Sequence, residues 1–215
     1  MAGIFITIEG IDGSGKTTQA RLLVDWLNGL GYRVRATREP GGTEAGKRLR
    51  KLVLSPERSI SPEAELFLYL ADRAINASQV VRPALAEESI VLCERHTDST
   101  LAYQGYGRGL DIALLRRLNT IATGGVKPDL TLVLDLPAAK ARLDEARLDR
   151  LESEGSEFLA RVGDGFRELA AGEPDRMKLI DASGDVRAVH EHIVALVCEL
   201  LEKQPPSGAR KREGP

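Results

Sequence analysis

Gly10-Ile11-Asp12-Gly13-Ser14-Gly15-Lys16-Thr17 lies close behind an apolar run of strand length at residues 4–8. The spacing of this motif, G-x-x-x-x-G-K-[ST], is typical of a phosphate-binding loop between a strand and a helix. Its glycines allow successive backbone N–H groups to face phosphate oxygens, and the helix that follows adds the positive end of its dipole. Lys16 is expected to reach the β- and γ-phosphates of a nucleoside triphosphate, and the hydroxyl of Thr17 to bind Mg²⁺. The alternative, a glycine-rich turn without a ligand, is disfavoured because a strand precedes the motif and an amphipathic segment follows it.

The composition indicates one soluble globular domain. The chain has 215 residues, of which 42% are hydrophobic and 29% charged, a size that suits one sizeable α/β domain and is short for two. A formal net charge of −2 gives no overall basic field of the kind that nucleic-acid-binding proteins carry, so an anionic substrate has to be met by local clusters of Arg and Lys. The two cysteines, Cys93 and Cys198, match no metal-binding spacing, and Cys93 is expected to be a small buried side chain.

The sequence shows no export signal and no membrane-spanning run. The N-terminus enters an apolar strand with no basic region before it, and no run of about eighteen apolar residues occurs. We therefore expect a cytoplasmic protein with neither a membrane nor a nucleic-acid partner. Residues 204–215 contain Pro205-Pro206 and Arg210-Lys211-Arg212 and are expected to form a disordered tail.

Apolar runs of strand length alternate with longer helical patterns along the chain. The expected strands are residues 4–8, 32–37, 90–93, 130–135 and 177–180, and the expected helices are 17–30, 62–86, 112–122, 154–171 and 186–203. Ser61 and Asp111 are expected to cap two of these helices. The alternation predicts an α/β fold in which a five-stranded parallel sheet carries helices on both faces. Ligands of such sheets gather at the carboxyl ends of the strands, so the residues that follow each strand are the candidates for a site.

Charged residues follow the second and third expected strands. Arg38 is a fork-shaped donor suited to a phosphate, and the bend Pro40-Gly41-Gly42 lets backbone approach a ligand closely; a surface turn with a solvated ion pair is the alternative. Arg95 is placed to hold a second anion across from the phosphate loop. Glu94 is placed to orient Mg²⁺-bound water or Arg38, although a structural ion pair is an equal alternative for both residues. His96 is expected to be a hydrogen-bonded structural histidine.

Two further segments have alternative interpretations. Asp135 ends the fourth expected strand, where it resembles the acidic end of a Walker-B strand or serves as a helix cap before Pro137. Residues 140–152 are crowded with charges of both signs. Such a segment is either an exposed helix with many salt bridges or a mobile lid that brings arginines onto a transferring phosphoryl group.

With these segments in line, the chain resembles bacterial thymidylate kinases over residues 4–201. The resemblance rests on three runs that occur in order after the expected strands: Thr37-Arg38-Glu39-Pro40-Gly41-Gly42-Thr43, Leu101-Ala102-Tyr103-Gln104-Gly105 and Pro128-Asp129-Leu130-Thr131-Leu132. It implies a P-loop NTPase fold, with one kinase domain over residues 1–203 and a small helical lid at about 140–152. It also implies a homodimer that transfers the γ-phosphoryl group of ATP to dTMP, with Mg²⁺, to give dTDP and ADP in dTTP biosynthesis.

The resemblance assigns functional roles position by position. ATP binding is assigned to Gly10, Asp12, Gly13, Ser14, Gly15, Lys16, Thr17 and Thr18, and metal binding to Thr17 and Glu94. Binding of the acceptor nucleotide is assigned to Asp12, Arg38, Tyr69, Arg73, Arg95, Thr100, Tyr103 and Gln104. The catalytic residues that it implies are Lys16, Arg38, Glu94, Arg95, Arg147 and Arg150.

Within the implied acceptor site, Arg38 and Arg95 clamp the phosphate. Tyr69 takes the place of the aromatic residue that stacks on thymine, and Arg73 hydrogen-bonds a base carbonyl. Tyr103 lies beneath the sugar and crowds out a 2′-hydroxyl group. Thr100 and Gln104 lie along the base and the sugar. Asp12 faces the sugar 3′-hydroxyl or the metal.

The family supplies its catalytic arginine either from the phosphate loop or from the lid. The loop interior of this chain, Ile11-Asp12-Gly13-Ser14, contains no basic residue, so the resemblance implies a lid arginine. The candidates are Arg142, Arg147 and Arg150, of which Arg147 and Arg150 are favoured.

Three features depart from the usual family pattern. Glu94 stands in place of Asp, the lid is shorter and more acidic than its commonest form, and Phe166 stands where Tyr is common. Phe67 is an alternative stacking residue, but it is out of register with Arg73 and is expected in the core.

Three other functions are weighed. Another pyrimidine (deoxy)nucleoside monophosphate kinase is possible in principle, but Tyr69, Arg73 and Tyr103 favour a deoxypyrimidine. A deoxynucleoside kinase needs a carboxylate to deprotonate a 5′-hydroxyl group, and the paired phosphate-binding arginines argue against it. A GTPase-type switch is disfavoured because no N-K-x-D motif for guanine occurs in the sequence.

Overall fold

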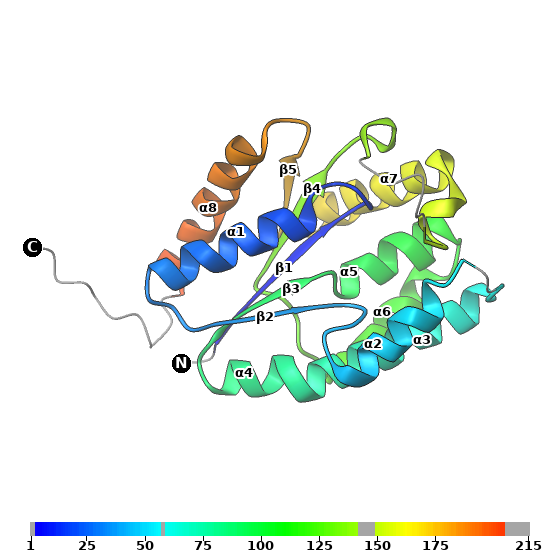
Figure 1. The fold of residues 1–215 in the computed structure, drawn as a ribbon, viewed down its shortest axis with the longest axis horizontal. Coiled ribbons are helices and arrows are strands. Elements are labelled where there is room, and N and C mark those ends of the chain that lie inside the picture. Colours follow the sequence, from blue (N-terminus) through cyan, green and yellow to red (C-terminus); the bar gives the residue numbers. More distant parts are fainter. Residues whose placement is uncertain (1–2, 57–58, 142–148, 205–215) are drawn as a thin grey trace, which may run out of the picture.

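Five parallel strands form one central sheet. The computed structural model describes residues 3–56, 59–141 and 149–204. The strand order is β2-β3-β1-β4-β5 (Figure 1). The strands are β1 (Ile4–Gly10), β2 (Val34–Arg38), β3 (Ile90–Glu94), β4 (Leu130–Asp135) and β5 (Met177–Asp181). The predicted five-stranded sheet is confirmed; β1, β2, β3 and β5 run slightly past their expected ends, and β2 begins at Val34 rather than at residue 32.

The helices cover both faces of this sheet, as the alternation of patterns predicts. They are α1 (Lys16–Gly29), α2 (Glu44–Val53), α3 (Pro62–Asn76), α4 (Arg82–Ala86), α5 (Thr97–Thr100), α6 (Ile112–Thr123), α7 (Ser156–Gly172) and α8 (Val186–Lys203). In Figure 1, α1 and α8 lie on one side of the sheet, and α2, α3, α4 and α6 lie on the other. The π-helical segments are Ala77–Val81 and Leu101–Gly107, and the 3₁₀ turns are Ala138–Lys140 and Glu152–Glu154.

The central strand β1 is buried along its whole length because both faces of the sheet are covered. Its successive side chains enter different apolar layers, as the period of two in a strand requires. Ile6 and Ile8 belong to the main hydrophobic cluster together with Leu23 of α1, whereas Phe5 belongs to a smaller cluster with Val81. The phosphate loop therefore starts from the most completely buried strand of the sheet.

Two helical regions differ from the sequence-based expectation. Helix α2 was not predicted: five of its ten residues are charged, and the helical spacing of its apolar residues Ala45, Leu49, Leu52 and Val53 was overlooked. Its start is fixed by Thr43, whose side chain accepts a hydrogen bond from the Gly46 N–H at 3.0 Å. The expected helix at 62–86 is a helical run with a π-helical turn just before Pro83, which cannot donate a backbone hydrogen bond.

The expected helix caps are confirmed. The side chain of Ser61 accepts from the Ala64 N–H at the start of α3, and that of Asp111 accepts from the Leu114 N–H at the start of α6. Residues 142–148 of the expected lid and residues 205–215 of the expected tail lie outside the described residues. Within the described ranges, no helix is long and apolar enough to cross a membrane.

The strand register brings the predicted site residues to one edge of the sheet. Ile8 of β1 pairs with Glu94 of β3, which in turn pairs with Arg38 of β2, and Gly10 pairs with Leu134 of β4. Because the strands are parallel, the segments that follow their carboxyl ends meet at this edge. The candidate site is built from these segments.

Candidate active site

The phosphate loop connects β1 to α1 and curls around Lys16. A side chain at Gly10 would place its Cβ 2.6 Å from the Leu134 carbonyl oxygen, and Gly15, with φ +94°, forms the N-cap of α1. The Lys16 Nζ is buried and donates to the Ile11 carbonyl at 2.7 Å. Burial, and after it the charge of Arg95, lowers the pKa of Lys16 to about 8. The loop thus holds a cation at its centre, in the place that phosphate oxygens take in such loops.

Thr17 and Glu94 place a hydroxyl and a carboxylate side by side next to the loop. The Thr17 hydroxyl lies 3.0 Å from both carboxylate oxygens of Glu94. A hydroxyl and a carboxylate are the hard oxygen ligands that Mg²⁺ prefers. The longer side chain of Glu94, compared with Asp, still reaches Thr17, so these residues fit a magnesium ion.

Arg95 connects the phosphate loop to the neighbouring pocket. Its guanidinium NH2 donates to Asp12 Oδ1 at 2.6 Å and to the Tyr103 hydroxyl at 3.0 Å, while the Tyr103 hydroxyl donates to Asp12 Oδ2 at 2.7 Å. Its NH1 donates to the Gly10 carbonyl and to the Ser99 hydroxyl. Burial acts to raise the pKa of Asp12, but the nearby cations, Arg95 first, outweigh it and hold that pKa at about 2. Arg95 is therefore a fixed positive charge between two subsites.

A pocket of about 490 Å³ is lined by Arg95 and Asp12 and does not include Lys16 in its wall. All of the residues predicted for the acceptor nucleotide line it except Arg38, namely Asp12, Tyr69, Arg73, Arg95, Thr100, Tyr103 and Gln104. The Tyr103 ring is held by edge-to-face contacts with Phe158 and Phe166, at centroid distances of 6.1 and 6.4 Å. These side chains lie far apart in the sequence, from Asp12 to Gln104, and the fold brings them together in one pocket.

Arg38 is exposed and lies outside this pocket. It lines a neighbouring open cleft together with Thr17 and Glu94. Arg38 therefore shares a cleft with the predicted metal ligands and does not line the acceptor pocket.

Arg73 is anchored by hydrogen bonds at the base of the pocket. Its Nε donates to Glu39 at 2.7 Å, and its NH1 donates to Thr100 and Asn119 at 2.5 and 2.6 Å. Its NH2 donates to the His96 carbonyl at 2.8 Å. These bonds fix the orientation of Arg73 on the pocket wall.

Of the three expected lid arginines, the structure describes only Arg150. Arg142 and Arg147 lie within residues 142–148, outside the described residues. Arg150 is described, and the structure does not bring it to the phosphate loop. Its Nε donates to the Val53 carbonyl at 2.9 Å, and its NH2 donates to Glu65 of α3 at 2.6 Å.

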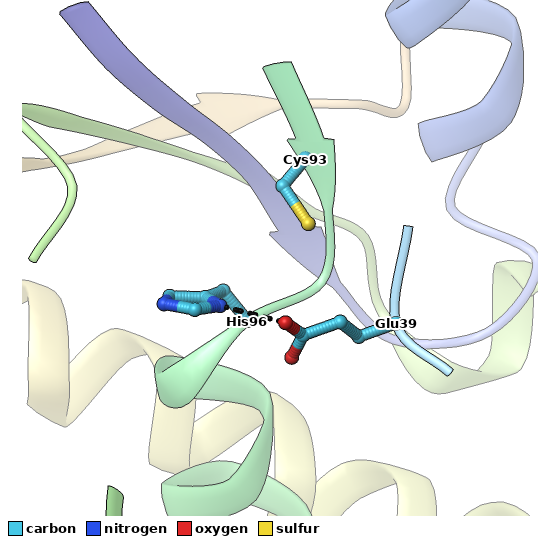
Figure 2. Close-up of side chains that lie close together, drawn as sticks. All are labelled: Glu39, Cys93 and His96. Atoms are coloured by element: carbon cyan, nitrogen blue, oxygen red, sulfur yellow. Dashed lines mark hydrogen bonds and ion pairs between the residues drawn. The ribbon is translucent and has the colours of Figure 1, made fainter. Parts of the chain in front are cut away.

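Glu39, Cys93 and His96 lie together, as Figure 2 shows, with the carboxylate of Glu39 facing the His96 ring, and Glu39 also lines the acceptor pocket. The His96 Nδ1 lies 3.1 Å from Glu39, which agrees with the predicted structural histidine. Glu39 is already paired with Arg73, and burial keeps the Cys93 thiol protonated by raising its pKa. A buried guanidinium and a protonated thiol make this cluster a poor metal site, so we interpret it as structural.

The comparisons with known proteins agree with this geometry. The family model described as thymidylate kinase matches residues 8–193. The chain belongs to the thymidylate kinase family. It is 53% identical to the thymidylate kinase of Synechococcus sp. (strain JA-2-3B'a(2-13)), a match that covers 98% of this chain and 100% of the relative. It is 47% identical to the thymidylate kinase of Desulforudis audaxviator, over 97% of this chain and 96% of the relative.

A solved thymidylate kinase structure has the same fold as this family member. The crystal structure of thymidylate kinase from Ehrlichia chaffeensis superposes with a TM-score of 0.77 at 34% sequence identity. The match covers 92% of this chain and all of that chain. The predicted P-loop NTPase fold is therefore confirmed.

Sequence reasoning missed two parts of the thymidylate kinase site. Arg50 lines the acceptor pocket and donates to the Pro40 carbonyl at 3.1 Å, but it lies on α2, the helix that was not predicted. A second pocket lies between the phosphate loop and the loop before α8, and its lining includes Thr18, Gly184 and Val186. Gln19 ties the two loops together by donating to the Val186 carbonyl at 2.8 Å. The sequence offered one signal for this second pocket, because the loop before α8 follows the end of the fifth expected strand.

Three other expectations concern side chains near the site. Phe67 was expected in the core and that prediction is wrong: it is 62% exposed, because it lies on the outer face of α3. Phe166 is buried against Tyr103, so this position contributes packing. Asp135 at the end of β4 pairs with Arg167 of α7 at 2.9 Å.

Asp72 supports the bend of the Pro40-Gly41-Gly42 segment at an electrostatic cost. Its Oδ1 accepts from the Gly41 N–H at 3.0 Å, whereas its Oδ2 is buried without a partner among the described residues. Burial, and after it the negative charge of Glu39, raises the pKa of Asp72 from 3.8 to about 6. The folded protein thus binds this proton more tightly than the unfolded chain, and stability falls as pH rises from about 4 to about 6.

We therefore expect Asp72→Asn to stabilise the protein at neutral and alkaline pH. Asparagine keeps an oxygen for Gly41 and removes the buried charge. The free energy of unfolding should rise by on the order of 1–3 kcal/mol at pH 8, and the difference should vanish near pH 4. Urea unfolding at the two pH values measures both quantities. Asp25→Asn on the exposed face of α1 is the control, and a less stable Asp72→Asn variant at pH 8 would contradict the expectation.

Proposed function

We propose that this protein transfers the γ-phosphoryl group of ATP to dTMP, giving dTDP and ADP in dTTP biosynthesis. The observation that carries the proposal is the contact of Arg95 with Asp12, which joins the phosphate loop to the acceptor pocket. Two anionic nucleotides bound in these subsites would meet end to end at a fixed guanidinium. Membership of the thymidylate kinase family supports the identity of the acceptor.

The chemistry requires positioning and charge neutralisation more than acid–base catalysis. The second pKa of a phosphate monoester is about 6, so the dTMP phosphate is already an anionic nucleophile at neutral pH. The barrier to overcome is repulsion between two polyanions. Lys16 would neutralise the ATP phosphates, and Arg38, Arg50 and Arg95 the acceptor phosphate. Mg²⁺ held by Thr17 and Glu94 would add positive charge at the β- and γ-phosphates.

The nucleoside of ATP fits the second pocket. That pocket adjoins Ser14, Gly15 and Thr18 of the phosphate loop and is closed on its other side by Gly184 and Val186. A nucleotide whose phosphates lie in the loop would place its base and sugar here. With Gly10, Asp12, Gly13, Lys16 and Thr17, these residues form the proposed ATP site.

Two tyrosines would select the acceptor nucleoside. Tyr69 is on the pocket wall four residues before Arg73, where it would stack on the base, and Arg73 would hydrogen-bond a base carbonyl. Burial, and after it the charge of Glu65, raises the pKa of Tyr69, so its ring stays neutral. Tyr103, held by Asp12 and Arg95, would lie against the sugar and exclude a 2′-hydroxyl group.

We propose that residues 1–203 form one domain whose lid, at about 140–152, supplies the catalytic arginine. Lid closure would exclude water and limit hydrolysis of ATP. Arg147 and Arg150 are the candidates. Since Arg150 is tied to Glu65 in this structure, it would have to leave that ion pair to reach a phosphoryl group.

A cytoplasmic homodimer belongs to the same proposal. Helices α3 and α6 pack together and expose Phe67, Leu114 and Ile121, at 62%, 43% and 75%. An apolar surface of this kind on two adjacent helices suits contact with a second copy.

Phe67→Asp is expected to convert the dimer into a monomer, because a charge in an apolar interface has to be desolvated. Light scattering coupled to size-exclusion chromatography should give about twice the chain mass of 23.4 kDa for the wild type and the single mass for the variant. Leu30→Asp, at an exposed position after α1, is the control and should leave the mass unchanged. A dimeric Phe67→Asp variant would place the interface elsewhere.

The proposed function is tested by a coupled assay for ADP with ATP, Mg²⁺ and a panel of acceptors. The panel contains dTMP, dUMP, dCMP, UMP, CMP and thymidine. We expect dTMP to give the highest kcat/KM and thymidine to give no turnover. Turnover with thymidine in place of dTMP would indicate a deoxynucleoside kinase, and ADP formation independent of any acceptor would contradict a kinase.

A further inference from the structure

Glu65 is a fully buried carboxylate at the edge of the acceptor pocket that the proposed reaction does not use. It lies in the first turns of α3 with 0% of its surface exposed. Its Oε1 accepts from the amide nitrogen of Gln104 at 2.7 Å. Its Oε2 accepts from Arg108 at 3.0 Å and from Arg150 at 2.6 Å. A buried charge with this many donors is fixed in place.

The contact with Glu65 decides which end of the Gln104 amide faces the pocket. A carboxylate between two guanidinium groups accepts hydrogen bonds and donates none, so the amide NH₂ of Gln104 must point toward Glu65. Gln104 also lines the acceptor pocket, and its amide oxygen is the end that remains for a ligand. Without Glu65, rotation by 180° about the last side-chain bond would exchange the oxygen and the NH₂ group at little cost.

The backbone of Gln104 is held in place. It belongs to the π-helical segment Leu101–Gly107, and its carbonyl accepts from the Leu110 N–H at 3.1 Å. A side chain on the next residue, Gly105, would place its Cβ 2.2 Å from Ile112, so the segment is packed tightly against α6. The orientation of the amide is thus the variable that Glu65 controls.

We infer that Glu65 is a positioning residue that makes the acceptor pocket selective for pyrimidines with an N–H at ring position 3, by holding the Gln104 oxygen toward the base. Thymine and uracil have this N–H, whereas cytosine has an unprotonated nitrogen there. A fixed acceptor therefore pairs with thymine and repels the lone pair of cytosine. A site that hydrogen-bonds one substrate strongly rejects an analogue that leaves its polar groups unpaired. The inference rests on the proposed function, because it takes dTMP as the nucleotide in this pocket.

Glu65→Gln tests the inference with a minimal change of shape. The oxygen of the new glutamine would stay with Arg108 and Arg150, and its NH₂ would face Gln104. Gln104 would then turn its oxygen to residue 65 and its NH₂ to the base. Affinities for dTMP, dUMP and dCMP are measured by calorimetry, with dCMP measured by displacement of bound dTMP. We expect the preference for dTMP over dCMP to fall roughly tenfold or more, and the ratio of dTMP to dUMP to stay constant.

Ratios of affinities on one preparation do not depend on the fraction of folded protein, so partial misfolding cannot mimic this result. Glu63→Gln is the matched control, since Glu63 lies on the same helix and is exposed; it should change neither ratio. In a Gln104→Leu background, Glu65→Gln should no longer change the preference for dTMP over dCMP, because the group that it orients is absent.

An unchanged preference in Glu65→Gln, or an equal fall in the Gln104→Leu background, would overturn the inference. If wild-type protein phosphorylates dTMP but the dTMP-to-dCMP affinity ratios of the variants do not change as expected, only the role of Glu65 is wrong. If wild-type protein does not phosphorylate dTMP, the proposed function fails and the inference fails with it.

Discussion

Arg95→Ala is expected to lower turnover by roughly 10³-fold and to raise the KM for dTMP, while the KM for ATP changes little. Arg95 lies between the phosphate loop and the acceptor pocket, and its guanidinium is held by Asp12 and Tyr103. Its removal would take away the cation that faces the acceptor phosphate, and would also release the Tyr103 ring that packs beneath it at 4.8 Å. The ATP phosphates would keep Lys16 and the backbone N–H groups of the loop. Steady-state kinetics with each substrate varied in turn measure the two effects separately.

Arg35→Ala is the matched control for this prediction. Arg35 lies on the exposed part of the edge strand β2 and carries the same charge, so its loss should leave both KM values and kcat near wild type. A nearly normal dependence on dTMP in Arg95→Ala would contradict the role of Arg95 in binding the acceptor phosphate.

Lys16→Ala is expected to abolish measurable turnover without loss of the fold. The lysine is a buried cation whose pKa is lowered to about 8 chiefly by burial, so the folded protein gains little stability from its charge. In the absence of ATP its one described hydrogen bond goes to the carbonyl of Ile11. Phosphoryl transfer depends on charges at the β- and γ-phosphates, and removal of one such cation typically costs about 10³-fold or more.

Circular dichroism and the melting temperature report on the fold of Lys16→Ala, and the coupled assay reports on its activity. Lys203→Ala, at the exposed end of α8, is the control and should keep full activity. Full turnover in Lys16→Ala would rule out the assignment of the phosphate loop, and loss of folded structure would show that Lys16 has a structural role that we do not expect.

The sheet could be predicted from the sequence because β1, β3 and β4 are mostly apolar runs that alternate with helical patterns, and the more polar β2 and β5 follow the same alternation. The central strand β1 is buried on both faces and is mostly apolar, although it also buries Thr7 and Glu9. Helix α2 was missed although its apolar residues Ala45, Leu49, Leu52 and Val53 have helical spacing. Its charged residues outnumber its apolar ones, and it is helical because Thr43 caps it and α3 packs against it.

The candidate site was largely predictable because parallel strands deliver their carboxyl ends to one edge. Asp12 and Arg95 come from segments that follow two paired strands, and they meet in an ion pair at 2.6 Å. Contacts that depend on the packing of helices were not predictable. The pairing of Arg150 with Glu65 and the position of Arg50 are examples, since nothing in the local sequence identifies the partner.

The prediction for Phe67 was wrong for a similar reason. An aromatic residue in a helical pattern is usually buried, and Phe67 was assigned to the core because it is out of register with Arg73 as a stacking residue. The structure turns the Arg73 face of α3 inward, toward Glu39 and Thr100, and the Phe67 side chain therefore lies on the opposite, exposed face.

The most direct test of the central claim follows the phosphoryl group itself. Purified protein is incubated with dTMP, Mg²⁺ and ATP labelled at the γ-phosphorus, and the nucleotides are separated by chromatography. We expect the label to appear in dTDP, in an amount equal to the ADP formed. Release of the label as inorganic phosphate, with dTMP recovered unchanged, would contradict a fold that brings two nucleotides together at Arg95.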